Sequence, residues 1–323
     1  MGAGGGGDRG VVAAASYEAR KYGVRSAMPS KIAKRRCPHL IFVRGRHERY
    51  KEISNQIMSV FLEFTDLVEP LSIDEAFLDV THNKKNLRSA TLIAQEIKSR
   101  IKEVTGLTAS AGISVNKFLA KIASDYRKPD GLFVITPKEV VAFVEDLPID
   151  KFFGVGKVTA DKMHRLGIFK GRDLKTRSLP ELVRLFGKAG AYYFQISRGI
   201  DNREVNPNRI RKSVGTEHTF LNDLADKIEI KKDMEHTAKD LLKRIQNSGF
   251  RGRTLTLKLK YSDFEQITRS KTIFQEIDRI DLLMKLAEDL LNQIDLRVSI
   301  RLIGLSVSNQ IDEKEPLQLT LDF

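Results

Sequence analysis

The sequence predicts an α+β protein that contains two split βαβ units with a helical segment between them. Residues 68–135 have the pattern of a hairpin, a helix, a strand, a helix and a strand. Residues 216–308 have the pattern of strand, helix, strand, strand, helix, strand. Both orders are typical of a ferredoxin-like layout, with helices on one face of an antiparallel sheet. We expect the first unit to be incomplete, because the chain offers no obvious first strand and helix for it.

The elements of the first unit follow from local patterns. Apolar residues recur at steps of three and four in its longer helix, as in an amphipathic helix. In its second helix, Lys117 and Lys121 lie one turn apart, and a Lys-Pro-Asp-Gly turn follows at 128–131. The predicted elements are a hairpin at 68–80, a helix at 87–104 ending near Gly106, a strand at 108–115, a helix at 116–126 and a strand at 132–135.

The second unit shows strand periodicity most clearly. Side chains alternate between two faces of a strand, so Leu255, Leu257, Leu259 and Tyr261 should face a core while Lys258 and Lys260 face outward. Arg269 and Lys271 alternate likewise, and a polar sheet face that carries these cations would suit a phosphate backbone. The alternative is that these cations only increase solubility. The predicted elements are strands at 216–220, 254–261, 266–273 and 299–308, and helices at 233–246 and 281–294.

Two adjacent carboxylates, Asp74 and Glu75, lie between two apolar runs in the hairpin at 68–80. Neighbouring side chains on a strand point to opposite faces, so two carboxylates that bind one ion are best placed at a tight bend, which Ser72 and Asp74 favour. Carboxylates held close together repel unless a cation neutralises them, and oxygen ligands suit Mg²⁺ or Mn²⁺. The alternative is a solvated acidic turn.

Composition indicates an anionic partner. The 323 residues contain 55 Lys and Arg against 42 Asp and Glu, for a net charge of +13, and residues 1–49 hold eleven basic and three acidic side chains. The single cysteine, Cys37, excludes an internal disulfide framework. No apolar run approaches the roughly 20 residues of a membrane-spanning helix, and the glycine-rich start lacks the apolar core of a signal peptide. We therefore expect a cytoplasmic protein. We also expect the glycine-rich start to be flexible.

Two further segments are candidates for phosphate binding. Tyr17 and Arg20 share a face if their segment is helical, and a hydroxyl beside a guanidinium suits a phosphate chain. Gly154 and Gly156 form a turn between two short predicted helices, followed by Lys157, which resembles a helix-hairpin-helix that binds DNA phosphate through backbone N–H groups. A surface contact and a flexible helical connection are the respective alternatives.

The C-terminal tail is charged and ends in a short apolar motif. Such an end usually docks in a pocket on a partner protein. A frayed strand is the alternative. The motif residues are Gln318, Leu319, Leu321 and Phe323.

Several motifs, in the same order along the chain, resemble the translesion Y-family DNA polymerases. The resemblance covers nearly the whole chain and implies fingers at 1–46, a palm at 47–136, a helical thumb with a helix-hairpin-helix at 137–205, a linker at 206–212, a βαββαβ little finger at 213–308 and a tail at 309–323. The motifs are Ala-Ser-Tyr-Glu-Ala-Arg-Lys-Tyr-Gly-Val-Arg at 15–25, Ser-Ile-Asp-Glu-Ala-Phe-Leu-Asp-Val at 72–80, Ser-Val-Asn-Lys-Phe-Leu-Ala-Lys at 114–121, and the turns at 128–131 and 154–156.

The resemblance implies low-fidelity, template-directed DNA synthesis with two Mg²⁺ ions, or Mn²⁺ in their place. Asp74 would bind both ions, and Glu75 would hold the ion at the primer terminus. Tyr17, Arg20 and Lys128 would bind the incoming dNTP. The implied partners are primer–template DNA and a bacterial sliding clamp, which the tail motif would bind. The resemblance also implies a monomer that does not associate with a membrane.

The sequence departs from the family pattern in one important respect. Family members carry an upstream strand, Asp-Met-Asp-Ala-Phe-Tyr, that supplies the first metal-binding Asp and an aromatic gate, and these 323 residues do not contain it. Asp8 has no matching context, and Ala14 stands where many relatives have Thr. We therefore expect DNA binding with poor extension, and a non-catalytic protein that binds DNA and the clamp is the main alternative. A two-metal nuclease fits the hairpin but not Tyr17, Arg20 and Lys128.

Overall fold

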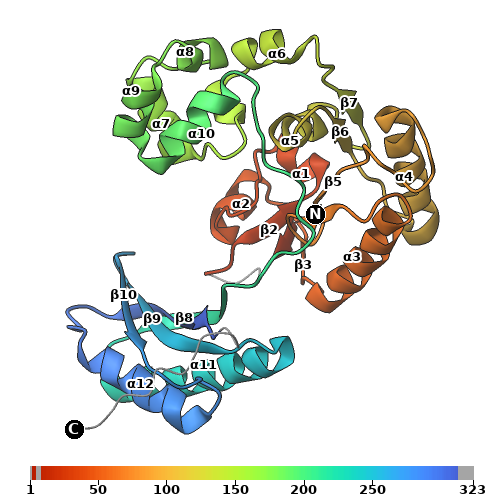
Figure 1. Ribbon diagram of the computed structural model, residues 1–323. Coiled ribbons are helices and arrows are strands. Elements are labelled where there is room, and N and C mark those ends of the chain that lie inside the picture. The colour runs from red at the N-terminus through yellow and green to blue at the C-terminus, as the bar shows by residue number, and fades with distance from the viewer. Residues whose placement is uncertain (1, 5–8, 312–323) are drawn as a thin grey trace, which may run out of the picture. The chain divides into compact units, whose positions relative to one another are not determined.

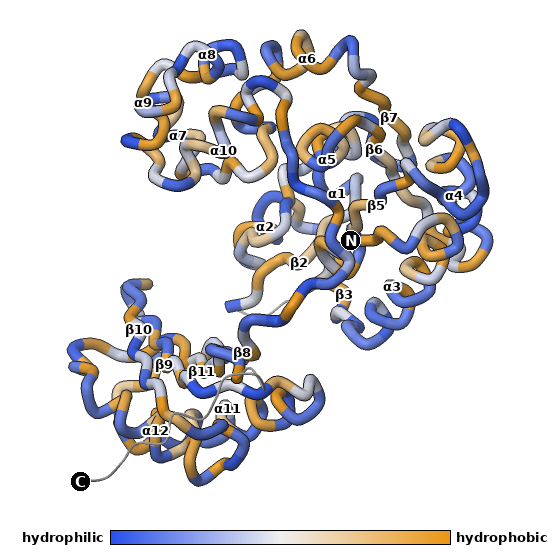
Figure 2. The backbone as a smooth tube through the Cα atoms, in the orientation of Figure 1, coloured by the Kyte–Doolittle hydropathy of each residue, from blue (hydrophilic) through white to orange (hydrophobic). Residues whose placement is uncertain are grey.

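The computed structural model describes residues 2–4 and 9–311, and the chain divides into two compact units. One unit comprises Met1–Gly45 with Ile210–Phe323, and the other comprises Arg46–Arg209 (Figure 1). Polar and apolar residues interleave along the elements of both units, as expected when each element buries one face (Figure 2). Among the described residues, no helix is long and apolar enough to cross a membrane.

The N-terminal part of the first unit is a small three-stranded sheet in the order β2-β1-β3. Strand β1 pairs antiparallel with β2 and parallel with β3. The expectation of a flexible start is therefore wrong for residues 2–4, which gain backbone hydrogen bonds on both sides, and residues 5–8 lie outside the described residues. The elements are β1 (Gly2–Gly4), β2 (Val12–Ala15), α1 (Tyr17–Lys21), α2 (Ser30–Arg36) and β3 (Phe42–Val43).

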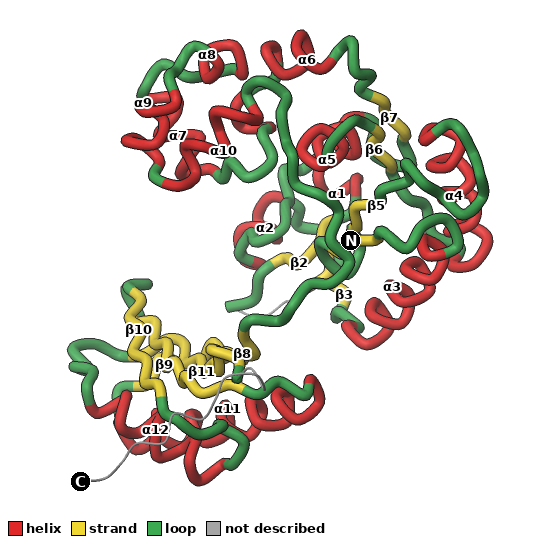
Figure 3. The backbone as a smooth tube through the Cα atoms, viewed as in Figure 1, coloured by secondary structure: helices red, strands yellow, loops and turns green. Residues whose placement is uncertain are grey.

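The C-terminal part of this unit is the predicted βαββαβ arrangement. Its four strands form an antiparallel sheet in the order β10-β9-β11-β8, and both helices pack on one face of it (Figure 3). Leu255, Leu257 and Leu259 are fully buried and Tyr261 is 3% exposed, which confirms the predicted alternation. The elements are β8 (Ser213–Leu224), α11 (Lys227–Ser248), β9 (Gly252–Tyr261), β10 (Gln266–Thr272), α12 (Ile280–Asn292) and β11 (Ile300–Gln310).

The strand register corrects one prediction about the sheet face. Residues directly opposite in an antiparallel pair share a face, and Arg269 lies opposite Leu257 while Lys271 lies opposite Leu255. Arg269 and Lys271 are therefore on the helix-covered side, where Lys271 reaches Asp289 of α12 at 2.9 Å. The expectation that they share a polar face with Lys258 and Lys260 is wrong.

The second unit contains the acidic hairpin and the helices that support it. It begins with α3. This is the first helix of the split βαβ unit, for which the sequence analysis found no candidate. Helices α3 and α4 pack around Val60, Phe64, Ile93, Ile97 and Ile101. The elements of this part are α3 (His47–Leu62), β4 (Val68–Pro70), β5 (Ala76–Leu78), α4 (Ala90–Thr105), β6 (Ala111–Ile113), α5 (Lys117–Tyr126) and β7 (Leu132–Val134).

The strands of the second unit form two separate ladders within the described residues. Strands β4 and β5 are an antiparallel pair, as predicted for the hairpin. Strands β6 and β7 pair in parallel. The order of elements is confirmed, but the single antiparallel sheet expected for this unit is not formed. Helix α5 packs against both strands of the second ladder, β6 and β7.

The rest of the second unit is helical. A buried cluster that includes Phe118, Phe152, Met163 and Leu182 joins these helices to α5. Helix α7 begins directly after the Gly-Val-Gly turn, as the predicted helix-hairpin-helix requires. The elements are α6 (Val140–Asp146), the 3-10 helix η1 (Ile149–Lys151), α7 (Lys157–Arg165), α8 (Gly171–Lys175), α9 (Leu179–Phe186) and α10 (Lys188–Ile196).

Candidate functional site

The turn between β4 and β5 presents Asp74 to solvent. The backbone N–H groups of Leu71 and Ser72 both donate to the Glu75 carbonyl, at 2.8 and 3.2 Å, and so close the bend. The Ser72 hydroxyl donates to Asp74 Oδ1 at 2.6 Å. Asp74 is exposed and Glu75 is partly buried. The bend thus brings two carboxylates to one turn, as the sequence predicted.

Glu75 is held by a lysine from another element. The Lys121 ammonium lies 2.8 Å from Glu75 Oε1, and α5 positions it. The Lys121 side chain is only 17% exposed, so little water competes for its charge. The sequence analysis noted Lys121 only as a helix residue. Its position four residues after Lys117 was the one feature of the sequence that could have suggested a role for Lys121 beside Lys117.

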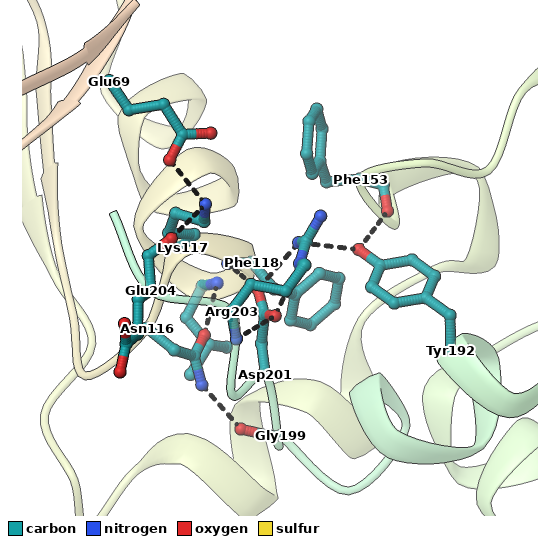
Figure 4. A network of polar contacts seen from close by, with 11 residues as sticks. Glu69, Asn116, Lys117, Phe118, Phe153, Tyr192, Gly199, Asp201, Arg203 and Glu204 are labelled. Carbon is teal, nitrogen blue, oxygen red and sulfur yellow. Dashed lines mark hydrogen bonds and ion pairs between the residues drawn. The ribbon is translucent and has the colours of Figure 1, made fainter. Parts of the chain in front are cut away.

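Lys117, unlike Lys121, does not pair with the acidic bend but joins two parts of the fold. Its ammonium donates to Glu69 Oε2 and to the Glu204 carbonyl, both at 2.7 Å (Figure 4). The backbone N–H of Asn206 also donates to Glu69. Burial raises the pKa of Glu69, but the hydrogen bonds from Lys117 and Asn206 outweigh it and hold that pKa below its ordinary value. Lys117 therefore ties β4 to the segment after α10.

Asp201 is the centre of the rest of this network (Figure 4). Its carboxylate accepts hydrogen bonds from the backbone N–H of Phe118 at 3.0 Å and from the Arg203 guanidinium at 2.7 and 2.8 Å. Burial raises the pKa of Asp201, and the Arg203 and backbone hydrogen bonds lower it by more. Asp201 thus caps the start of α5, the helix that carries Lys121. The sequence analysis missed it entirely.

The three predicted nucleotide-binding residues fall in different units. Lys128 lies in the second unit, where its ammonium is 2.6 Å from Asp125 Oδ1. Tyr17 and Arg20 lie on α1 in the first unit, and they contact each other, with the guanidinium carbon 4.9 Å from the ring centroid. Arg20 Nε also donates to the Ala15 carbonyl at 3.1 Å. The predicted shared face of Tyr17 and Arg20 is confirmed.

The Gly-Val-Gly turn leaves a helix start open. Gly154 has a φ of +91°, a conformation that favours glycine, and Gly156 is the N-cap of α7 without any side-chain hydrogen bond. Gly154, Gly156 and Lys157 are exposed. Within the described residues no side chain caps α7, so the N–H groups of its first turn are available to a phosphate.

Lys258 and Lys260 lie on the face of the sheet opposite α11 and α12, called here the uncovered face. Lys258 pairs with Glu217 of β8 at 2.7 Å, and Gln266 lies directly opposite Lys260. Small and polar side chains such as Thr256, Ser270 and Ser306 complete this face. The tail motif Gln318, Leu319, Leu321 and Phe323 lies outside the described residues.

Three family models match the chain. The impB/mucB/samB family model matches residues 1–125, its C-terminal domain model matches residues 211–321, and the helix-hairpin-helix model of the same family matches residues 137–168. Together these matches span the two carboxylates, the Gly-Val-Gly turn and the four-stranded sheet.

Curated relatives are similar over nearly the full chain. DNA polymerase IV of Bacteroides fragilis is 55% identical over 309 residues, which cover 95% of this chain and 85% of the relative. DNA polymerase IV 3 of Mesorhizobium japonicum is 54% identical over 321 residues, or 99% of this chain and 89% of the relative.

Solved structures give the same result at the level of fold. A Y-family DNA polymerase chimera of Dbh and Dpo4 is 34% identical, with a TM-score of 0.88 over 96% of this chain and 92% of that one. A post-insertion binary complex of Dbh DNA polymerase is 32% identical, with a TM-score of 0.63 over 96% of this chain and 91% of that one.

Proposed function

This chain belongs to the impB/mucB/samB family, the Y-family DNA polymerases, and we propose that it adds nucleotides to a primer by two-metal transfer on the turn that holds Asp74 and Glu75. Members of this family are DNA-directed DNA polymerases that act in translesion synthesis. The observation that carries the proposal is the pair of adjacent carboxylates at the bend, exposed Asp74 and partly buried Glu75, inside the region that the family model matches.

The donor set at the bend fits a hard divalent cation. Asp74 and Glu75 offer only oxygen ligands, which suit Mg²⁺ or Mn²⁺ and disfavour softer metals. Such ions would stabilise the negative charge on the primer oxygen and on the phosphate groups. Lys121 fixes one oxygen of Glu75 and so restricts the directions in which that carboxylate can bind. Ser72 orients Asp74 in the same way.

The cations named by the resemblance are the proposed dNTP-binding groups. Arg20 keeps its charge at all physiological pH values and presents paired donors to a phosphate chain. Tyr17 contacts its guanidinium and adds a hydroxyl. Lys128 would neutralise further phosphate charge, as a point charge on a flexible stem.

Primer–template DNA is the proposed macromolecular substrate. The open start of α7 and the lysines of the uncovered sheet face both suit phosphate contacts, which carry no base sequence information. The Dbh structures similar to this chain include complexes described as binary and ternary. The sliding clamp, a monomeric state and a cytoplasmic location stay predictions from the sequence.

The function is tested by single-nucleotide addition. The chain is mixed with a labelled primer–template, each of the four dNTPs in turn, and Mg²⁺ or Mn²⁺. We expect addition that depends on the metal and is fastest for the dNTP complementary to the template base. Addition without regard to the template, or without metal, would contradict the proposal.

A second candidate function is DNA and clamp binding without synthesis. It applies to these 323 residues tested by themselves, because the third carboxylate that the resemblance implies is not among them. Retained binding of primer–template DNA with no nucleotide addition, even at high enzyme concentration, would support this candidate and contradict the polymerase proposal for these residues.

A further inference from the structure

Two histidines and a carboxylate converge between β8 and α11, in the compact unit that does not contain the acidic hairpin. His236 and Asp240 lie four residues apart and so share one face of α11. His218 lies on the helix-covered face of β8, because it pairs with Ile303, which is fully buried. One ligand atom from each of the three lies within 4.8 Å of the other two.

His218 has an unsatisfied nitrogen that points into this cluster. Its Nε2 is buried and makes no hydrogen bond among the described residues, although it lies 3.3 Å from Asp240 Oδ2. A buried nitrogen that makes no hydrogen bond destabilises the folded state unless another group satisfies it. The ring of His236 completes the cluster, with its centroid 5.5 Å from that of His218. A cation among the three would satisfy all of them.

We propose that His218, His236 and Asp240 bind a divalent transition-metal ion, with Zn²⁺ as the expected occupant. Two ligands of a tetrahedral zinc ion, each bonded at about 2.1 Å, lie roughly 3.4 Å apart. The 3.3 Å between His218 Nε2 and Asp240 Oδ2 already matches this separation. His236 is exposed, and its ligand nitrogen lies within 4.8 Å of the other two ligand atoms, so a side-chain rotation would bring it to bonding separation.

The ligand types also separate this site from the acidic hairpin. Two imidazoles and one carboxylate suit Zn²⁺, Ni²⁺ or Cu²⁺, whereas the oxygen-only hairpin suits Mg²⁺. Asp240 and His218 are partly exposed, which leaves room for water as a fourth ligand. Arg244, one turn further along α11, donates to the Gly215 carbonyl of β8. The ion would join the same two elements that Arg244 joins and so stabilise their packing.

The chain contains matched controls for this proposal. His164 and Asp150 form another histidine–carboxylate pair, at 3.4 Å, which belongs to no cluster of three ligands among the described residues. Cys37 and His39 lie 3.5 Å apart and could bind a soft metal by themselves. The substitutions His164→Asn and Cys37→Ser therefore report binding elsewhere.

The test is equilibrium dialysis and calorimetric titration of the full chain with Zn²⁺, and visible absorption with Co²⁺ as a spectroscopic substitute. We expect one tight equivalent, with Co²⁺ absorption typical of tetrahedral coordination. His236→Asn and Asp240→Asn should each weaken binding by about tenfold or more, since even loss of a residue that only supports a ligand has effects of that size. His164→Asn and Cys37→Ser should bind as the unchanged chain does.

Thermal unfolding supplies a readout that is independent of DNA synthesis. An ion that binds only the folded state raises the melting temperature of the unchanged chain, and His236→Asn, an exposed position, should lose that rise while keeping its metal-free melting temperature. Absence of saturable Zn²⁺ binding would overturn the proposal. Binding that survives both His236→Asn and Asp240→Asn, or that is lost in Cys37→Ser, would also overturn it.

Discussion

At the scale of single residues, the acidic bend depends on side chains far from it in the sequence. Asp201 caps the start of α5, and α5 carries the lysine that pairs with Glu75. The carboxylate pair could be predicted, because two acids between apolar runs are unusual. Asp201 could not, because a lone Asp more than 80 residues from Phe118 gives no local signal of the contact.

The network at Asp201 predicts a pH-dependent stability. Its pKa is lowered in the folded protein, so its stabilisation is fully present above the ordinary carboxyl pKa near 4 and is lost as pH falls through the lower folded value. Asp201→Asn should reduce the free energy of unfolding by about 2 kcal/mol at pH 7. The difference should shrink as pH is lowered from 7 to 3 in urea unfolding experiments.

The exposed Asp66, paired with Lys84, is the matched control. Asp66→Asn should change the free energy of unfolding by less than about 1 kcal/mol at either pH. A difference between Asp201→Asn and the unchanged chain that stays constant from pH 7 to pH 3 would contradict the proposed cause.

At the scale of elements, the helix start after the Gly-Val-Gly turn gives a direct test of DNA binding. A methyl group at Gly156 meets nothing within 4 Å, and the φ of −81° suits any residue. Gly156→Ala should therefore leave the melting temperature unchanged but weaken primer–template binding severalfold, because the methyl group would obstruct a phosphate at the helix start. Fluorescence anisotropy measures the affinity, and an unchanged affinity would count against this contact.

The two faces of the four-stranded sheet give a second test at this scale. Lys258→Gln with Lys260→Gln removes cations from the uncovered face, and Arg269→Gln with Lys271→Gln removes two from the helix-covered side. We expect only the first pair to weaken DNA binding clearly and to reduce the slope of log affinity against log salt, by about one to two units. Equal effects of both pairs would contradict the assignment of the uncovered face to DNA.

Element patterns explain what the sequence could and could not reveal. The four strands and two helices of the C-terminal sheet show strong alternation or helical periodicity, and all were predicted. Helix α3 was missed because only Val60 among its residues is fully buried, which leaves a weak apolar pattern. The face of Arg269 was missed because alternation within a strand does not fix its register with the next strand. The parallel pairing of β6 and β7 likewise has no local signal.

At the scale of the whole molecule, the net charge and the tail indicate partners rather than fold. The charge of +13 predicts DNA binding that weakens steeply with salt.

Deletion of residues 318–323 should leave unassisted nucleotide addition unchanged and abolish stimulation by a sliding clamp, because Leu319, Leu321 and Phe323 are the apolar anchors of the tail motif. Equal clamp stimulation of the deleted and full-length chains would contradict this prediction.

The most direct test of the proposed chemistry is single-turnover nucleotide addition by Asp74→Asn and Glu75→Gln, with Asp66→Asn as the exposed acidic control. Enzyme in excess over primer–template makes even slow addition measurable. We expect each hairpin substitution to lower the rate by about a hundredfold or more, since each removes a proposed ligand of the ions that stabilise the transition-state charge, with DNA affinity little changed. Asp66→Asn should match the unchanged chain. Nucleotide addition by Asp74→Asn at the rate of the unchanged chain would contradict the assignment of the catalytic site to this turn.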